Sequence, residues 1–152
     1  MSEYTFEVVR TIPASSAKIY ALVADYRVGH PSILPRPPFG ELVVEEGGIG
    51  AGTVIRFELK LAGKWHTTRA RITEPKPGMQ LDESDLAGNF VTSYHFEPLS
   101  AAETRLTIRT VARTRAGGLA GWLERFFTPR MLKPVYEREL DLLTAKVVVS
   151  AS

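Results

Sequence analysis

The stretch of sequence that decides the fold spans residues 55–72 and reads IRFELKLAGKWHTTRARI. Apolar and charged residues alternate on both sides of Ala62-Gly63, which is the pattern of two strands joined by a two-residue turn. With that turn, Leu61 pairs with Lys64, and each residue of the first strand back to Ile55 has a defined partner on the second strand. One face of the hairpin then carries seven mainly apolar residues: Ile55, Phe57, Leu59, His66, Thr68, Ala70 and Ile72. The other face is charged, so both strands agree about which side meets solvent.

A second turn signal, Ala87-Gly88, organises the next pair of strands in the same way. Treated as a two-residue turn, it places Leu81 opposite Tyr94 and Glu83 opposite Thr92, again with one mainly apolar face. Strict alternation over the next strand adds four residues to that face: Leu106, Ile108, Thr110 and Ala112. The sequence therefore predicts a sheet of antiparallel strands with one side turned toward a core.

The ends of the chain have helical features. A strand over residues 4–12 stops at Pro13, and Ser15 or Ser16 can cap a short helix that ends near Asp25. Residues 26–40 are rich in proline and leave room for at most a short helical turn. From Gly118 to Val149 the apolar residues form one stripe with helical spacing: Trp122, Phe126, Pro129, Leu132, Tyr136, Leu140, Leu143 and Val147.

Two prolines interrupt this last segment. Pro129 and Pro134 each lack the backbone donor that a residue inside a helix needs. We therefore expect a break or kink there, with Thr128 capping a second helical segment.

Composition indicates an ordinary globular protein. The 152 residues are 44% hydrophobic and 24% charged, which favours a single domain over residues 1–152. A net charge of +2 is too small to imply a polyanion, so no nucleic-acid partner is expected, and the absence of cysteine excludes disulfides and thiolate chemistry. The N-terminus lacks a signal-peptide pattern, and no apolar run approaches the ~20 residues of a membrane span. We expect a cytoplasmic protein without stable membrane insertion; homodimer formation stays open.

Six short motifs follow one another along the chain: IPA at 12–14, AD at 24–25, GGIGAGT at 47–53, TEPKPG at 73–78, FEP at 96–98 and ETRL at 103–106. In this order, and followed by a long amphipathic helix, the sequence resembles the helix-grip fold of the SRPBCC superfamily. That superfamily includes the polyketide cyclase/dehydrase and lipid-transport family, START domains and the birch-pollen allergen. The resemblance implies an α+β fold in which a curved seven-stranded antiparallel sheet wraps around a long C-terminal helix, with two short helices after the first strand. The resemblance implies a ligand-binding pocket, but it does not imply a particular reaction.

Polar residues on the inward face support such a pocket. Burying them unpaired would cost about 1–3 kcal/mol for each neutral group, so a purely structural core would not select them. Alternatively, Glu83 is hydrated at an open end of the sheet and the Tyr94 hydroxyl reaches solvent. The predicted ligand-binding residues are Phe57, Leu59, His66, Thr68, Leu81, Glu83, Thr92, Tyr94, Phe96, Ile108, Trp122 and Phe126. The loop over residues 29–40 is expected to form part of the entrance.

Three functions fit this reading. The first is a carrier or sensor that binds an apolar small molecule, such as a lipid, polyketide or quinone, between the sheet and the C-terminal helix. The second is a cyclase or dehydratase in which Tyr94 donates a proton to a carbonyl and His66 or Glu83 acts as base. The third is a protein-interaction module. The sequence leaves open whether the protein is an enzyme.

Metal and nucleotide sites are not favoured. His30, His66 and His95 lack the spacing of a metal triad, and no cofactor is expected. The glycines at 48, 50 and 52 lead into a strand, so no helix N-terminus follows them to hold a phosphate.

Overall fold

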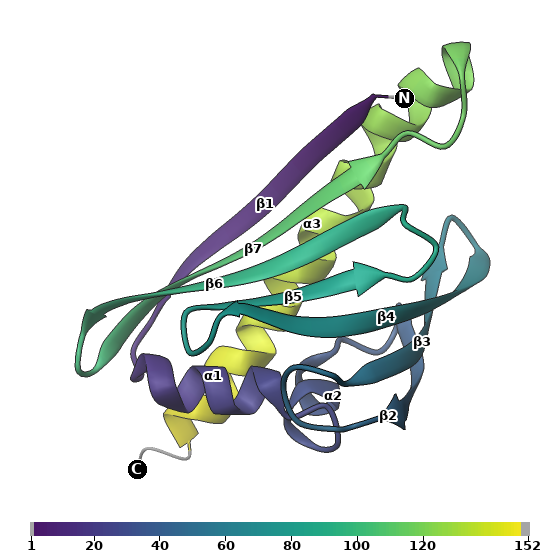
Figure 1. Ribbon diagram of the computed structural model, residues 1–152. Helices are drawn as coiled ribbons and strands as arrows, with labels where there is room; N and C mark the ends of the chain where they lie inside the picture. Colours follow the sequence, from purple (N-terminus) through teal and green to yellow (C-terminus); the bar gives the residue numbers. More distant parts are fainter. Residues whose placement is uncertain (1, 150–152) are drawn as a thin grey trace.

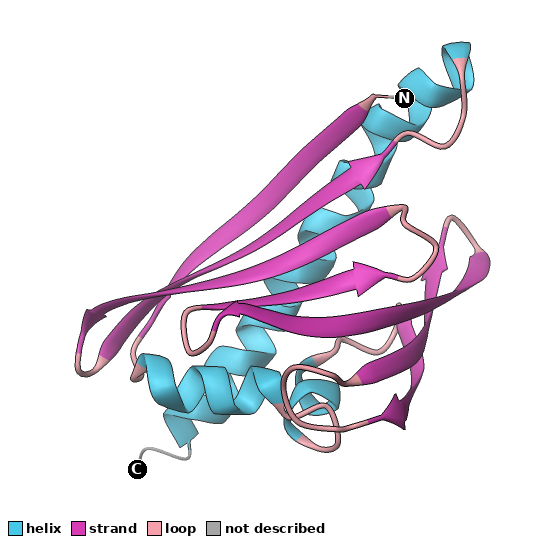
Figure 2. Cartoon of the chain, in the orientation of Figure 1, coloured by secondary structure: helices cyan, strands magenta, loops and turns pink. Residues whose placement is uncertain are grey.

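In the computed structural model, which describes residues 2–149, seven antiparallel strands form one curved sheet in the order β1-β7-β6-β5-β4-β3-β2 (Figure 1). The strands are β1 (Glu3–Ile12), β2 (Phe39–Glu46), β3 (Val54–Leu61), β4 (Lys64–Lys76), β5 (Gln80–Asp85), β6 (Phe90–Ser100) and β7 (Glu103–Arg113). Two short helices, α1 (Ser16–Ala24) and α2 (Gly29–Ile33), follow β1, and the long helix α3 (Gly118–Val149) follows β7. Figure 2 shows α3 crossing one face of the sheet, with α1 and α2 at one end of it. The predicted α+β helix-grip fold is confirmed.

The hairpin of β3 and β4 has the predicted register. Leu61 pairs with Lys64, and the ladder continues to Ile55 opposite Ala70. Ala62 and Gly63 have φ values of 51° and 78°, the left-handed conformation that a two-residue turn between twisted strands requires. The turn residues and the alternation of side chains thus agree, and the apolar side faces the core.

The hairpin of β5 and β6 confirms the predicted register but corrects the predicted turn. Leu81 lies opposite Tyr94 and Glu83 opposite Thr92. The strands end at Asp85 and Phe90, however, so the connection is longer than two residues. The carboxylate of Asp85 accepts hydrogen bonds from the backbone N–H groups of Ala87 and Asn89, at 3.2 and 3.0 Å. These bonds replace ladder bonds and stabilise the wider loop.

The helix α3 is continuous across Pro129 and Pro134, so a break there, with Thr128 as the cap of a second segment, is wrong. Each proline removes only one backbone bond, to the carbonyl four residues earlier. Both lie in the more exposed half of the helix, where water can bond the freed carbonyl. Within residues 2–149, no helix is long and apolar enough to cross a membrane.

The C-terminal half of α3 packs into the main core. Leu140, Leu143 and Val147 are at most 2% exposed and belong to the same cluster as Ile12, Ile19 and Leu106. Beside this end of α3, the Ser15 hydroxyl caps α1 by accepting a bond from the Lys18 N–H, as predicted.

We predict that Leu140→Ala lowers the free energy of unfolding by about 2–5 kcal/mol, because the cavity it leaves lies inside a closed core. Leu142→Ala is the matched control, since Leu142 lies on the same helix but is 39% exposed, and it should cost less than about 1 kcal/mol. Urea unfolding of both variants measures the difference. Equal losses would contradict the view that this half of α3 anchors the helix to the sheet.

Candidate functional site

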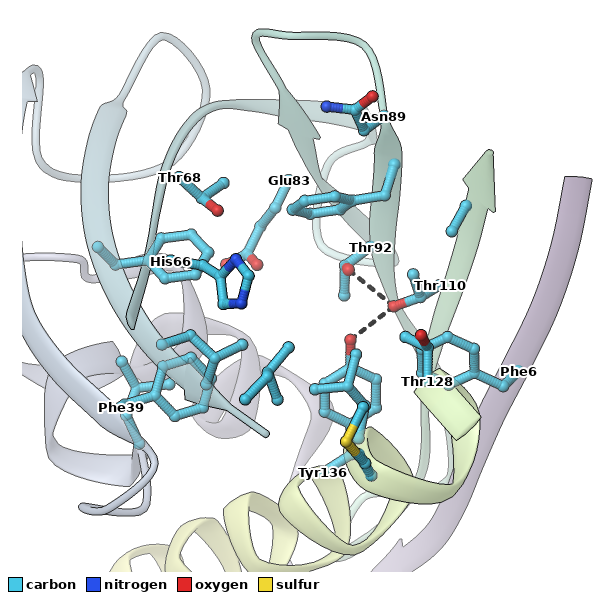
Figure 3. A pocket seen from close by; sticks show the side chains of 18 of the residues that line it. Phe6, Phe39, His66, Thr68, Glu83, Asn89, Thr92, Thr110, Thr128 and Tyr136 are labelled. Atoms are coloured by element: carbon cyan, nitrogen blue, oxygen red, sulfur yellow. Dashed lines mark hydrogen bonds between the residues drawn. The ribbon is translucent and has the colours of Figure 1, made fainter. Parts of the chain in front are cut away.

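A cavity of about 620 Å³ lies between the sheet, α2 and α3 (Figure 3). This volume falls within the roughly 300–1,000 Å³ that is usual for small-molecule sites. Much of the wall is apolar and comes from β1, the loop before β2, β2, β3 and α3: Phe6, Leu34, Phe39, Leu42, Ile55, Phe57, Leu59 and Leu132.

The cavity opens toward solvent at the tip of the β3–β4 hairpin. Four of its lining residues there are exposed: Ala62, Trp65, His66 and Thr67. Leu34 and Phe39, from the proline-rich segment, also line the cavity. The Arg138 guanidinium donates to the carbonyl of Pro37 at 2.7 Å and ties this segment to α3.

The inner end of the cavity holds a buried histidine between two carboxyl groups. His30, on α2, is 2% exposed, and its Nδ1 lies 2.8 Å from the carbonyl of Val23. Because a carbonyl only accepts hydrogen bonds, Nδ1 carries a proton. Nε2 then faces Glu83 Oε2 at 3.4 Å and Glu139 Oε1 at 3.8 Å.

Two tyrosines complete this arrangement. The Tyr26 hydroxyl donates to Glu83 Oε2 at 2.5 Å, and the Tyr26 ring stacks on His30 with centroids 4.4 Å apart. The Tyr94 hydroxyl donates to Glu139, at 3.1 Å from Oε1 and 3.3 Å from Oε2. We call these five residues, Tyr26, His30, Glu83, Tyr94 and Glu139, the acid cluster. All of them except Tyr26 line the cavity.

Glu139 retains its proton to an unusually high pH. Burial, followed by the nearby charge of Glu83, raises its pKa to about 8, although the hydrogen bond from Tyr94 acts in the opposite direction. Burial also raises the pKa of both Tyr26 and Tyr94 well above the ordinary value. Near neutral pH, Glu139 is therefore a neutral acid that can donate a proton within the cavity.

A chain of hydroxyl groups lies beside the acid cluster. Thr92 Oγ1 and Thr110 Oγ1 are 2.8 Å apart, and Thr110 Oγ1 is 2.7 Å from the Tyr136 hydroxyl (Figure 3). All three residues line the cavity and are buried. Because each hydroxyl can donate or accept, this chain of hydroxyl groups can donate a hydrogen bond to a ligand or accept one from it.

Seven of the predicted ligand-binding residues line the cavity: Phe57, Leu59, His66, Thr68, Glu83, Thr92 and Tyr94. Their contact with a ligand stays a prediction. Leu81, Phe96 and Ile108 do not line it, although they share the inward face. They are at most 2% exposed and belong to the closed part of the core, where Phe96 packs edge-on against Tyr20. Alternation identifies the face of a sheet but not whether a helix covers it.

Trp122 and Phe126 also lie away from the cavity, which corrects the predicted helix wall. They are 52% and 37% exposed and stack on each other with centroids 5.4 Å apart. The residues of α3 that line the cavity are Glu124, Thr128, Met131, Leu132, Tyr136 and Glu139. In the N-terminal part of α3, the side that carries Trp122 and Phe126 therefore faces away from the cavity, whereas the apolar stripe predicts that it faces the cavity.

The two candidate bases, His66 and Glu83, lie far apart in the structure. Glu83 pairs with Ile72 in the ladder, and His66 lies six residues farther along β4. Six residues span roughly 20 Å of strand, so His66 belongs to the mouth. The histidine beside Glu83 is His30, which sequence reasoning placed in an irregular loop. Glu139 was missed as well, although its spacing from Tyr136 and Leu143 places it on the buried side of the helix.

The described residues contain no group of three or more His, Cys, Asp or Glu side chains that could hold a metal ion.

Solved structures share this fold. The KanY protein, known from an NMR solution structure, matches with a TM-score of 0.82 at 26% identity, over 97% of this chain and 99% of that chain. The Zhui aromatase/cyclase from Streptomyces sp. R1128 has a TM-score of 0.82 at 20% identity, over 99% of this chain and 97% of that chain. A START superfamily protein from Mycobacterium smegmatis has a TM-score of 0.71 at 13% identity, over 95% and 97% of the two chains. The last two likenesses show the fold alone.

A family model described as polyketide cyclase / dehydrase and lipid transport matches residues 3–148. No curated protein matches the sequence.

We predict that the stability of the protein falls between about pH 4.5 and pH 8 because of Glu139. In this window the unfolded chain has lost a proton that the folded chain keeps, so the free energy of unfolding falls as pH rises, by up to about 5 kcal/mol. Glu139→Gln has no proton to lose and should lack this decline. Urea unfolding at a series of pH values measures both proteins.

A second variant sharpens this test. Tyr94→Phe removes the hydrogen bond that lowers the pKa of Glu139, so the decline should extend to higher pH than in the parent. Parallel stability curves for the parent and Glu139→Gln would show that Glu139 does not hold its proton.

Proposed function

The chain belongs to the polyketide cyclase / dehydrase and lipid transport family, and from this premise we propose that it binds a mainly apolar small molecule with a polar group at its inner end. The observation that carries the proposal is the cavity of about 620 Å³, which has apolar walls and ends at the acid cluster and the hydroxyl chain. The matches to a START protein and to aromatase/cyclases agree with the predicted membership of the SRPBCC superfamily.

The walls favour an apolar ligand body. Four residues of β2 and β3 line the cavity and are only partly buried: Phe39, Leu42, Phe57 and Leu59. Water beside these side chains is released when an apolar ligand takes its place, and this release favours binding.

The inner end favours a ligand that carries a carbonyl or hydroxyl group. The neutral carboxyl of Glu139 can donate a hydrogen bond, and the hydroxyl chain of Thr92, Thr110 and Tyr136 can donate or accept one. A carbonyl oxygen would use these donors, whereas a plain hydrocarbon would leave them facing an apolar surface. Among the ligand classes of the first hypothesis, polyketides and quinones meet this requirement best.

We predict that N-phenylnaphthylamine, a neutral apolar fluorescent probe, binds the parent at about one equivalent with micromolar affinity. Thr68→Trp should weaken this binding at least about tenfold, because Thr68 lines the cavity and the larger ring would occupy it. Thr73→Trp is the matched control, since Thr73 is an exposed residue on the same strand that does not line the cavity. Equal titration curves for the two variants would argue against a ligand in this cavity.

A second candidate function is favoured by the acid cluster. Cyclisation and dehydration of carbonyl compounds require one group that gives a proton to oxygen and another that takes a proton from carbon. Glu139 is a protonated acid in the cavity, and His30 Nε2 lies 3.8 Å from it with Nδ1 already carrying a proton. In this mechanism Glu139 is the donor in place of the predicted Tyr94, and His30 is the base in place of His66 or Glu83.

We predict that, if a cyclisable polyketone that binds the parent is also turned over, Glu139→Gln lowers kcat by about 10² or more while binding persists. Glu137→Gln is the control, because Glu137 is bonded to Arg10 and does not line the cavity. Steady-state turnover with each variant decides the point. Tight binding by the parent without turnover would reject the enzyme and leave the carrier.

A further inference from the structure

The N-terminal end of α3 exposes a continuous apolar surface. Five residues form it, with exposures of 74% for Leu119, 52% for Trp122, 39% for Leu123, 37% for Phe126 and 50% for Phe127. Spacings of three and four place them on one side of the helix, and we call this surface the apolar ridge. An amphipathic helix of a globular protein ordinarily turns such a side toward the core, whereas this one turns it outward.

Specific contacts on the opposite side of the helix determine that the ridge faces outward. A Cβ on Gly121 would lie 2.3 Å from the carbonyl oxygen of Ala116, so only glycine allows this close approach. The Glu124 carboxylate accepts bonds from the N–H of Arg115 at 3.0 and 3.2 Å. Arg125 donates to the Ser2 hydroxyl at 3.3 Å. The polar side of the helix is thus bonded to the body, and the ridge has to face solvent.

The segment that carries the ridge is rich in basic residues, and one of them lies directly on it. Residues 113–136 contain five basic side chains and a single acidic one, Glu124, which already accepts the bonds from Arg115. The basic residues are Arg113, Arg115, Arg125, Arg130 and Lys133. The Arg130 guanidinium lies 3.6 Å from the centroid of the Phe126 ring, so charge and apolar surface are adjacent.

We propose that the apolar ridge docks onto the surface of an anionic lipid bilayer. Leucine, tryptophan and phenylalanine side chains suit the boundary between acyl chains and headgroups, and arginine and lysine bind anionic headgroups. This mode lies on the membrane and requires no spanning helix. A second copy of the chain fits less well, because a two-fold contact through the ridge would bring the Arg130 side chains of both copies into the same interface.

The ridge lies behind one end of the cavity. Glu124, Thr128 and Met131 line the cavity from neighbouring turns of the same helix. A docked protein would therefore hold this end of the cavity close to the lipid surface. The docking itself needs no ligand, so it can be tested separately from the proposed function.

The test uses the full chain and vesicles made either of phosphatidylcholine or of equal parts phosphatidylcholine and phosphatidylglycerol. The parent should sediment with the anionic vesicles and be released by added salt. Trp122→Ser combined with Phe127→Ser should weaken this binding at least about tenfold. Arg130→Gln should weaken it about fivefold. The chain has two tryptophans, so Trp65→Phe leaves Trp122 as the reporter, and its emission should shift to shorter wavelength on anionic vesicles.

The matched control is Val28→Ser combined with Ile49→Ser, because these residues are 71% and 63% exposed but lie outside the ridge. This variant should bind anionic vesicles as the parent does. Failure of the parent to sediment with anionic vesicles, or equal sedimentation of the ridge variant, would overturn the proposal. Self-association of the parent in analytical ultracentrifugation that the ridge variant loses, without vesicle binding, would assign the ridge to a second copy. N-phenylnaphthylamine binding by the ridge variant reports on the cavity independently.

Discussion

The packing of Leu140, Leu143 and Val147 against the sheet determines where α3 lies. These side chains are nearly inaccessible and fill the space beside β1, β6 and β7 together with residues of α1. Toward its other end α3 presents shorter or polar side chains to the sheet, among them Thr128 and Glu124, so the space between them stays open. The cavity and the apolar ridge are therefore two results of one arrangement. The helix is held firmly at one end, and at the other it turns its polar side inward.

The acid cluster shows how this fold keeps charge-bearing groups away from water. Its members come from α2, β5, β6, α3 and the turn after α1. Each carboxyl group accepts a hydrogen bond from a tyrosine hydroxyl. Among the described residues, no buried side-chain nitrogen or oxygen lacks a hydrogen-bond partner. Burial of Glu139 beside Glu83 raises its pKa, so the cluster holds a proton near neutral pH instead of two separate negative charges. The polar acid cluster can therefore lie at the inner end of a cavity whose walls are apolar.

The same geometry serves a carrier and an enzyme. A carrier uses the protonated Glu139 and the hydroxyl chain to hold a polar group, and an enzyme additionally moves the proton to the ligand and returns it. The two functions differ in proton movement and not in the shape of the site. The apolar ridge is a separate feature, because none of its five residues lines the cavity.

The sequence by itself determined the register of two hairpins and the face of each that turns inward. Ala62-Gly63 allows one hairpin geometry, and the two-residue period of a strand then assigns Phe57, Leu59 and Thr68 to one side. Only the tertiary structure decided that Leu81 and Ile108 are closed in the core, and that His30 and Glu139 meet at Glu83. The tertiary structure also decided that the side of α3 that carries Trp122 faces solvent. Periodicity is a local property, whereas the side of a helix that is covered depends on contacts with distant residues such as Ser2.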